Sequence, residues 1–115
     1  MGTTNFESSV KTTAISIRDG VKNESTAKIC RVDTGSYIYE AFLRIYNGNN
    51  TEIWVTKSNK VSMTNRYSQV LAKTQVRVSN YGIEYDNQGG KITIPVRLSK
   101  QLIKYCKELN KYLGR

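Results

Sequence analysis

The stretch YIYEAFLRIYNGNNTEIWVTK, residues 37–57, decides the fold of this chain. Its first ten residues carry large side chains on both alternating faces, which is typical of a strand that lies centrally in a sheet or at an interface. Asn47-Gly48-Asn49-Asn50 then has the composition of a hairpin turn, and residues 51–57 can pair back as the next strand. The apolar spacing alone would also fit a helix, but the turn favours an antiparallel hairpin.

The flanking sequence predicts further strands on both sides of this hairpin. Upstream, residues 12–18 alternate in polarity before Asp19-Gly20, and residues 27–32 form a second apolar run. Downstream, residues 61–63 fit a short edge strand and residues 70–78 a long alternating strand. Residues 83–86 and 91–98 fit a hairpin across Asn87-Gln88-Gly89-Gly90, with Pro95 at or near a sheet edge because proline has no amide hydrogen.

The C-terminal residues 99–113 predict one amphipathic helix. Ser99 is a suitable N-cap, and Leu98 can pack on Ile103 as a hydrophobic staple. An apolar stripe faces the core and a lysine row lies opposite it; the stripe is Leu102, Cys106, Leu109 and Leu113, and the row is Lys100, Lys104, Lys107 and Lys111. The row is either a solvated face or a contact surface.

These elements predict an α+β fold. We expect a β-rich antiparallel sheet of six to eight short strands, with one C-terminal amphipathic helix packed on it. Residues 1–10 are polar and predict a flexible N-terminus, and residues 11–115 then form a single domain of common size.

The net charge of +9 is unevenly distributed along the chain. Residues 1–52 hold six basic and six acidic side chains, whereas residues 53–115 hold twelve basic and three acidic ones. The whole surplus therefore lies in the second half, which favours a polyanionic partner such as nucleic acid.

Several classes of function are disfavoured by composition. The chain has no histidine, and its acids are scattered, so we expect no enzyme, no metal site and no cofactor. Cys30 and Cys106 are expected to be buried free thiols in a reducing compartment. The sequence has neither a signal-peptide pattern nor an apolar run of membrane-spanning length, so we expect a cytoplasmic, intracellular protein without membrane contact.

Residues 53–82 contain the candidate binding residues. This stretch has no Asp or Glu, and its cations could contact phosphates while its aromatic rings stack on bases. Two further cations, on the strand predicted over residues 91–98, could join the same outer sheet face. The candidates are Lys57, Lys60, Arg66, Lys73, Arg77, Lys91 and Arg97 for phosphates, with Trp54, Tyr67 and Tyr81 for stacking. The alternative is an ordinary solvated sheet face with the aromatic residues in the core.

The C-terminal third resembles a known family. A strand, a glycine-rich turn, a second strand, and Ile94-Pro95-Val96-Arg97-Leu98-Ser99 leading into Lys100-Gln101-Leu102 and a helix are similar to the end of PC4-like and Whirly-type domains. The resemblance implies a curved antiparallel sheet that binds single-stranded nucleic acid and a helix that mediates dimerisation. It assigns Lys73, Arg77, Lys91 and Arg97 to the sheet surface, and Leu102, Cys106 and Leu109 to helix packing.

We therefore expect a non-enzymatic nucleic-acid-binding protein that prefers single strands and acts as a regulator or a replication or transcription accessory. A homo-oligomer could form through the C-terminal helix or through the segment Tyr37–Tyr46. Two alternatives stay open. One is a small phage-type protein–protein module that inhibits or redirects an acidic host protein, and the other is a coat-like structural subunit.

Overall fold

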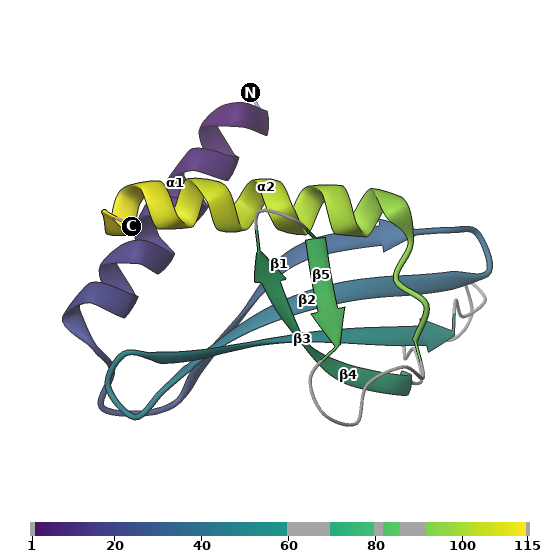
Figure 1. Ribbon diagram of the computed structural model, residues 1–115, viewed down its shortest axis with the longest axis horizontal. Coiled ribbons are helices and arrows are strands. Elements are labelled where there is room, and N and C mark those ends of the chain that lie inside the picture. The colour runs from purple at the N-terminus through teal and green to yellow at the C-terminus, as the bar shows by residue number, and fades with distance from the viewer. Residues whose placement is uncertain (1, 60–69, 80–81, 86–91, 115) are drawn as a thin grey trace, which may run out of the picture.

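The computed structural model of the chain describes residues 2–59, 70–79, 82–85 and 92–114. Its elements follow one another as α1 (Gly2–Asp19), β1 (Ser25–Asp33), β2 (Tyr37–Tyr46), β3 (Asn50–Asn59), β4 (Val70–Ser79), β5 (Gly82–Tyr85) and α2 (Val96–Leu113). The strands form one antiparallel sheet in the order β1-β2-β3-β4-β5 (Figure 1). The predicted α+β class is confirmed, with five strands instead of six to eight.

The hairpin predicted from residues 37–57 forms β2 and β3. Tyr46 pairs with Asn50 across the turn, and the pairing continues in register to Tyr37 opposite Asn59. Asn47 and Gly48 turn the chain with φ values of 47° and 85°. Asparagine and glycine tolerate this left-handed region best, which is why the turn forms at this place.

The other predicted strands are confirmed in part. Residues 27–32 lie within β1, residues 70–78 within β4, and residues 83–85 within β5, whereas residues 61–63 lie outside the described residues. β1 contains a bulge, because its register with β2 shifts between Lys28 and Cys30. The extra residue, Ile29, lets Lys28 and Arg31 face the same side of the sheet although they are three positions apart.

The strand predicted over residues 12–18 is wrong, because these residues belong to α1. The helix also includes residues 2–10, where a flexible N-terminus was expected. Alternation over a few residues suggested a strand, but Val10, Ala14 and Ile17 recur at helical spacing and are all buried. Thr12, Thr13 and Ser16 bond their hydroxyls to backbone carbonyls four residues earlier, which satisfies these polar groups inside the helix.

Gly20 ends α1 and brings it against the β2–β3 turn. Its φ is 78°, and its amide donates to the carbonyl of Ser16 at 3.0 Å, a common glycine cap. The next amide, that of Val21, donates to the carbonyl of Gly48 at 2.7 Å. A Cβ on Gly20 would lie 3.4 Å from that same carbonyl oxygen. The positive φ explains why glycine suits this cap, whereas a Cβ would meet the Gly48 oxygen at an ordinary contact distance.

The predicted strand over residues 91–98 is also wrong. Residues 92–95 are not in a strand, and α2 begins at Val96, one turn before the predicted Ser99 N-cap. Pro95 occupies the N-cap position with φ −59°, and no side chain caps the helix there. Proline suits a helix start because it has no amide to pair and its φ is already fixed.

The buried stripe of α2 consists of Leu98, Leu102, Tyr105 and Leu109. Leu102 and Leu109 were predicted, whereas Tyr105 takes the position expected for Cys106, which is only partly buried. The Tyr105 hydroxyl donates to the Thr13 hydroxyl at 2.9 Å, so its polar end is satisfied inside the α1–α2 contact.

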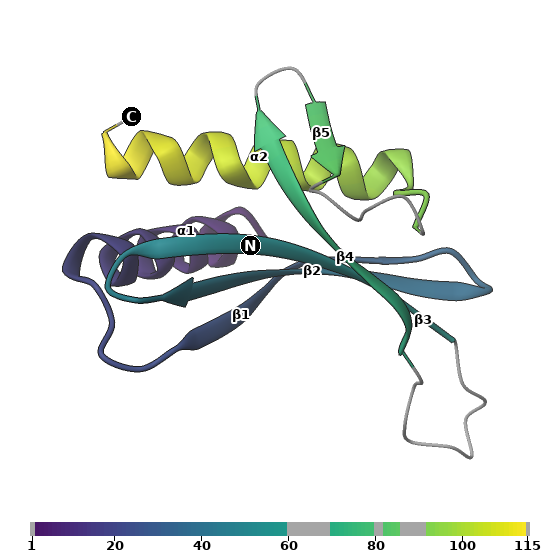
Figure 2. The same cartoon turned by 60° about the horizontal axis from the view of Figure 1, so that its bottom comes forward.

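Both helices contribute to one core. α2 lies across the sheet and α1 crosses α2 near its C-terminal half (Figure 1). One face of the sheet supplies the buried partners of the helices, which are Cys30, Val32, Tyr39, Ala41, Leu43, Ile45, Val55 and Val76. Figure 2 looks toward the side of β1, β2 and β3 that neither of the described helices covers.

Candidate nucleic-acid interface

The side of the sheet that faces away from the helices is called the open face below. Because side chains alternate along a strand, the pairing register assigns residues to it. They include Thr26, Lys28, Arg31 and Asp33 on β1; Ile38, Glu40, Phe42, Arg44 and Tyr46 on β2; Glu52, Trp54 and Thr56 on β3; Lys73, Gln75 and Arg77 on β4; and Glu84 on β5.

An aromatic pair lies at the centre of the open face. Phe42 and Trp54 are direct partners across β2 and β3, and both are half-buried. On the neighbouring strand, the Lys73 ammonium lies 5.4 Å from the centroid of the Trp54 ring. The two rings help to line a shallow hollow of about 310 Å³, whose lining residues are Glu24, Thr26, Phe42, Arg44, Trp54, Thr56 and Lys73.

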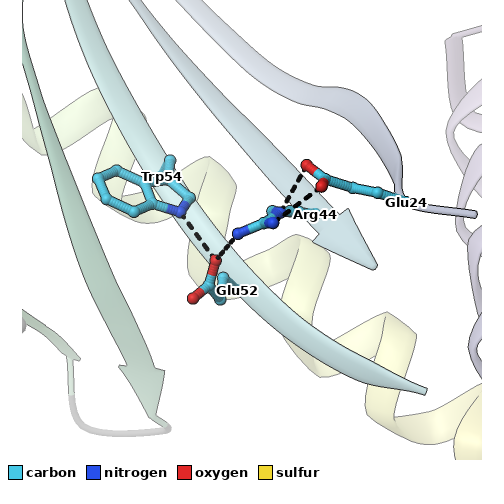
Figure 3. A network of polar contacts seen from close by, with 4 residues as sticks. All are labelled: Glu24, Arg44, Glu52 and Trp54. Carbon is cyan, nitrogen blue, oxygen red and sulfur yellow. Dashed lines mark hydrogen bonds and ion pairs between the residues drawn. The ribbon is translucent and has the colours of Figure 1, made fainter. Parts of the chain in front are cut away.

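Arg44, which lines this hollow, donates hydrogen bonds to two acidic side chains. Its Nε and Nη2 donate to the two carboxylate oxygens of Glu24 at 2.6 and 2.8 Å, and its Nη1 donates to Glu52 at 2.8 Å. The same Glu52 oxygen accepts a hydrogen bond of 3.3 Å from the Trp54 indole (Figure 3). In Figure 3 these side chains lie in front of the strands and the helices lie behind.

The hydrogen bonds from Arg44 favour the ionised forms of both acids. They lower the pKa of Glu24 and the pKa of Glu52. In return, the two carboxylates raise the pKa of Arg44. All three groups are therefore charged at neutral pH. The carboxylate of Glu52 that accepts the hydrogen bond from the Trp54 indole is thus ionised.

The charges on the open face balance. Its strands carry five cations and four acids, and Glu24 at the rim adds a fifth acid. Glu40 is paired with Lys28 at 2.5 Å, as Glu24 and Glu52 are with Arg44. The surplus of positive charge in the chain therefore lies elsewhere, and the distinguishing feature of this face is its aromatic pair.

Of the ten residues predicted from the sequence, three come together here. Trp54, Lys73 and Arg77 share the open face, with Lys73 and Arg77 exposed. Lys57 lies on β3 but on the opposite face, where its ammonium is 4.1 Å from the centroid of the Tyr37 ring. Arg97 is exposed in the first turn of α2, so the prediction that it shares a sheet face with Lys73 is wrong.

The remaining five predicted residues lie outside the described residues. They are Lys60, Arg66, Tyr67, Tyr81 and Lys91. The core of the candidate site therefore consists of Trp54, Lys73 and Arg77 together with residues that the sequence reasoning did not select.

Phe42 and Arg44 are the main residues that sequence reasoning missed. The hairpin register would have found them, because a turn over residues 47–49 places Phe42 opposite Trp54 and Arg44 opposite Glu52. Both residues lie outside the acid-free stretch of residues 53–82, because their own strand carries Glu40 and Glu52 begins the partner segment just before that stretch.

The two thiols belong to the packed side of the molecule. Cys30 lies on β1 and Cys106 on α2, and neither is in a disulfide. Burial raises the pKa of Cys30 to about 12 and the pKa of Cys106 to about 11, so both are protonated at neutral pH. Across the described ranges, no three Cys, Asp or Glu side chains gather as a metal site would require.

No protein-family model matches the chain, and neither a curated protein nor a solved structure shows significant similarity to it. Among the described segments, neither helix combines the length and the apolar character that crossing a membrane requires.

Proposed function

We propose that the protein is a non-enzymatic binder of single-stranded nucleic acid and that the open face is its binding surface. The observation that carries this proposal is the Phe42–Trp54 pair, two half-buried rings on neighbouring strands of a sheet face that no described helix covers (Figure 2). Aromatic rings in this setting stack on the flat faces of bases. A role as a regulator or as a replication or transcription accessory would follow from such binding.

The geometry favours a single strand over a duplex. Bases in a duplex are stacked on one another and cannot reach rings on a sheet, whereas the bases of a single strand can be splayed onto them. Lys73 and Arg77 border the rings on β4 and supply cations for the neighbouring phosphates. Thr56 and Gln75 offer a hydroxyl and an amide that can bond to base edges.

The balance of charge on the open face predicts a weak salt dependence. If Lys73 and Arg77 neutralise two phosphates, the logarithm of the affinity should fall against the logarithm of salt with a slope of about −1.4. Stacking, which salt does not screen, then supplies most of the affinity.

Trp54 makes the proposal directly measurable, because it is the chain's only tryptophan. Titration with a short single-stranded oligonucleotide should quench its fluorescence, whereas a duplex of the same length should not. Trp54→Ala should weaken binding of a labelled single strand roughly 5- to 150-fold, the range expected for the loss of one stacked base.

Tyr37→Ala is the matched control, since this half-buried aromatic residue lies on β2 but faces the other side of the sheet. It should leave the affinity for the single strand unchanged. Absence of quenching at low salt, or equal losses in the two variants, would contradict the proposal.

A second candidate function is recognition of another protein through the same face. The observation favouring it is that three of the acids of the open face and its rim are already paired with Arg44 or Lys28. Paired charges of both signs around an aromatic centre are also suited to binding the surface of a partner protein. This candidate corresponds to the predicted phage-type module, and it gains support if no oligonucleotide quenches Trp54.

Oligomerisation stays a prediction in this proposal. The apolar stripe of α2 is buried against the rest of the chain, and β2 is paired on both sides by β1 and β3. β1 has no strand partner on its outer side among the described residues, so strand pairing between copies, as in a coat-like subunit, would use that edge. Light scattering on the purified protein measures its oligomeric state directly.

A further inference from the structure

The exposed side of α2 carries a regular row of cations, Lys100, Lys104, Lys107 and Lys111. Each of these lysines follows a residue of the buried stripe by two positions, which is about 200° around a helix of 3.6 residues per turn. The row therefore points away from the sheet. It runs for about 16 Å along the axis, because each residue advances a helix by 1.5 Å.

Of the described helices and strands, this helix carries the largest share of the surplus charge, a net +4 of the chain's +9. α2 contains five cations, the four of the row and Arg97, but only one acid, Glu108. The ion pairs between described residues all lie on the open face, and none involves a lysine of α2. The row thus has little internal compensation for its charge.

Aromatic side chains at the α1–α2 contact support the row. The Lys104 ammonium lies 5.0 Å from the centroid of the Phe6 ring, and the Lys11 ammonium from α1 lies 5.6 Å from that of Tyr112. These contacts hold two ammonium groups beside the helix surface without neutralising them. Three lysines of the row also line a shallow hollow of about 320 Å³, whose lining residues are Lys100, Ile103, Lys104, Lys107 and Glu108.

We propose that the lysine row of α2 is a second nucleic-acid surface that binds the phosphate backbone without reading its sequence. Lysine is depleted in protein–protein interfaces, whose centres are apolar, so a row of exposed lysines fits phosphates better than a protein partner. Ammonium groups act as point charges on phosphate, and the nearby rings lie beneath lysines, so bases have no stacking surface here. The row should therefore accept duplex and single strands alike.

The test measures binding of a fluorescein-labelled duplex by anisotropy between about 50 and 200 mM salt. Four phosphate contacts give a slope of about −3.6, so affinity should fall by about two orders of magnitude across that range. The variant Lys100→Gln/Lys104→Gln/Lys107→Gln/Lys111→Gln should lose most of this duplex affinity and its salt dependence. All four side chains are exposed, so circular dichroism should show an intact fold.

The matched comparison removes charge from the other face. Lys73→Gln/Arg77→Gln should keep duplex binding and weaken the single-strand binding that Trp54 quenching reports, whereas Lys104→Gln/Lys107→Gln should lower duplex affinity about tenfold near 100 mM salt and leave Trp54 quenching unchanged. Duplex binding that is absent at low salt, or that the four-lysine variant retains, would overturn the inference. An acidic protein would then be the better partner for the row. If a single strand failed to quench Trp54, the result would contradict only the proposed function of the open face, and the inference about the lysine row would stand.

Discussion

Arg44 forms ion pairs with Glu24 and Glu52 beside Trp54. Its pairing with Glu24 has the geometry that arginine also uses for phosphate. Glu24 takes the Nε–Nη2 edge of the guanidinium with both carboxylate oxygens. That bidentate arrangement is also how arginine holds a phosphate. Glu24 precedes β1 and is exposed. It therefore occupies the edge of the Arg44 guanidinium that a nucleic-acid phosphate could otherwise use.

Removing the charge of Glu24 should therefore strengthen binding of a single strand. We expect Glu24→Gln to raise the affinity several-fold, because Arg44 becomes available for one additional phosphate. The salt dependence should steepen at the same time, by about 0.7 in the slope of log affinity against log salt. The measurement is the Trp54 fluorescence titration, repeated across a salt series.

Glu7→Gln is the control, because Glu7 is an exposed acid on α1 and its loss changes the net charge equally. If both variants gained affinity to the same extent, the effect would come from net charge, and a specific competition at Arg44 would be excluded.

At the scale of elements, the strands could be read from the sequence more fully than the helices. The segment Tyr37–Tyr46 was placed as a strand at its observed bounds, because a tight Asn-Gly turn and side chains of strand type agree there. The open-face pairing of Phe42 with Trp54 follows from the same register. This part of the candidate site was accessible from local pattern alone.

The helices were harder to predict because their burial depends on each other. Val10, Ala14 and Ile17 form a helical stripe only when α2 is there to cover it, and the residue that bonds across the contact, Tyr105, is far away in the sequence. Around Pro95, apolar residues alternate with polar ones as they do in a strand, although no strand forms over residues 92–95. Ile92 and Leu98 are indeed both buried, but one lies before α2 and the other within its first turn. Tertiary packing decided both cases.

The end of α1 provides a test of local backbone geometry. Gly20→Ala places a Cβ on a residue at φ 78° and close to the carbonyl of Gly48, so we expect a loss of about 1–2 kcal/mol of unfolding free energy from the conformation alone. Urea unfolding followed by circular dichroism measures the loss.

Gly35→Ala serves as the comparison, because Gly35 also has a positive φ, 95°, but a Cβ added there would have no atom within 4 Å. A larger loss at Gly20 would report the contact with the β2–β3 turn. Equal losses would show that this contact adds nothing beyond the backbone strain.

For the whole molecule, the two proposed surfaces face opposite directions. The open face lies on one side of the sheet, and the lysine row points outward from the helix that covers the other side. One short strand cannot contact both at once. A single copy of the protein should therefore hold two nucleic-acid segments.

A capture experiment tests this arrangement. Beads carrying a duplex should retain a labelled single strand when the wild-type protein is added. They should not retain it with Trp54→Ala or with the four-lysine variant. Mixing the two variants separates a bridging monomer from an oligomer, because only an oligomer that exchanges subunits would recover capture. Recovery would contradict bridging by one copy.

The order of elements along the chain has a consequence for synthesis on the ribosome. Each strand pairs with its sequence neighbour, so the sheet can assemble as it emerges. α1 emerges before the sheet, yet its partner α2 follows the five described strands, and the Tyr105–Thr13 hydrogen bond spans 92 residues. A nascent chain thus carries an assembled sheet with its apolar side unprotected until α2 is made. During that interval we expect the chain to bind chaperones, and we expect the two helices to dock together after the sheet has assembled.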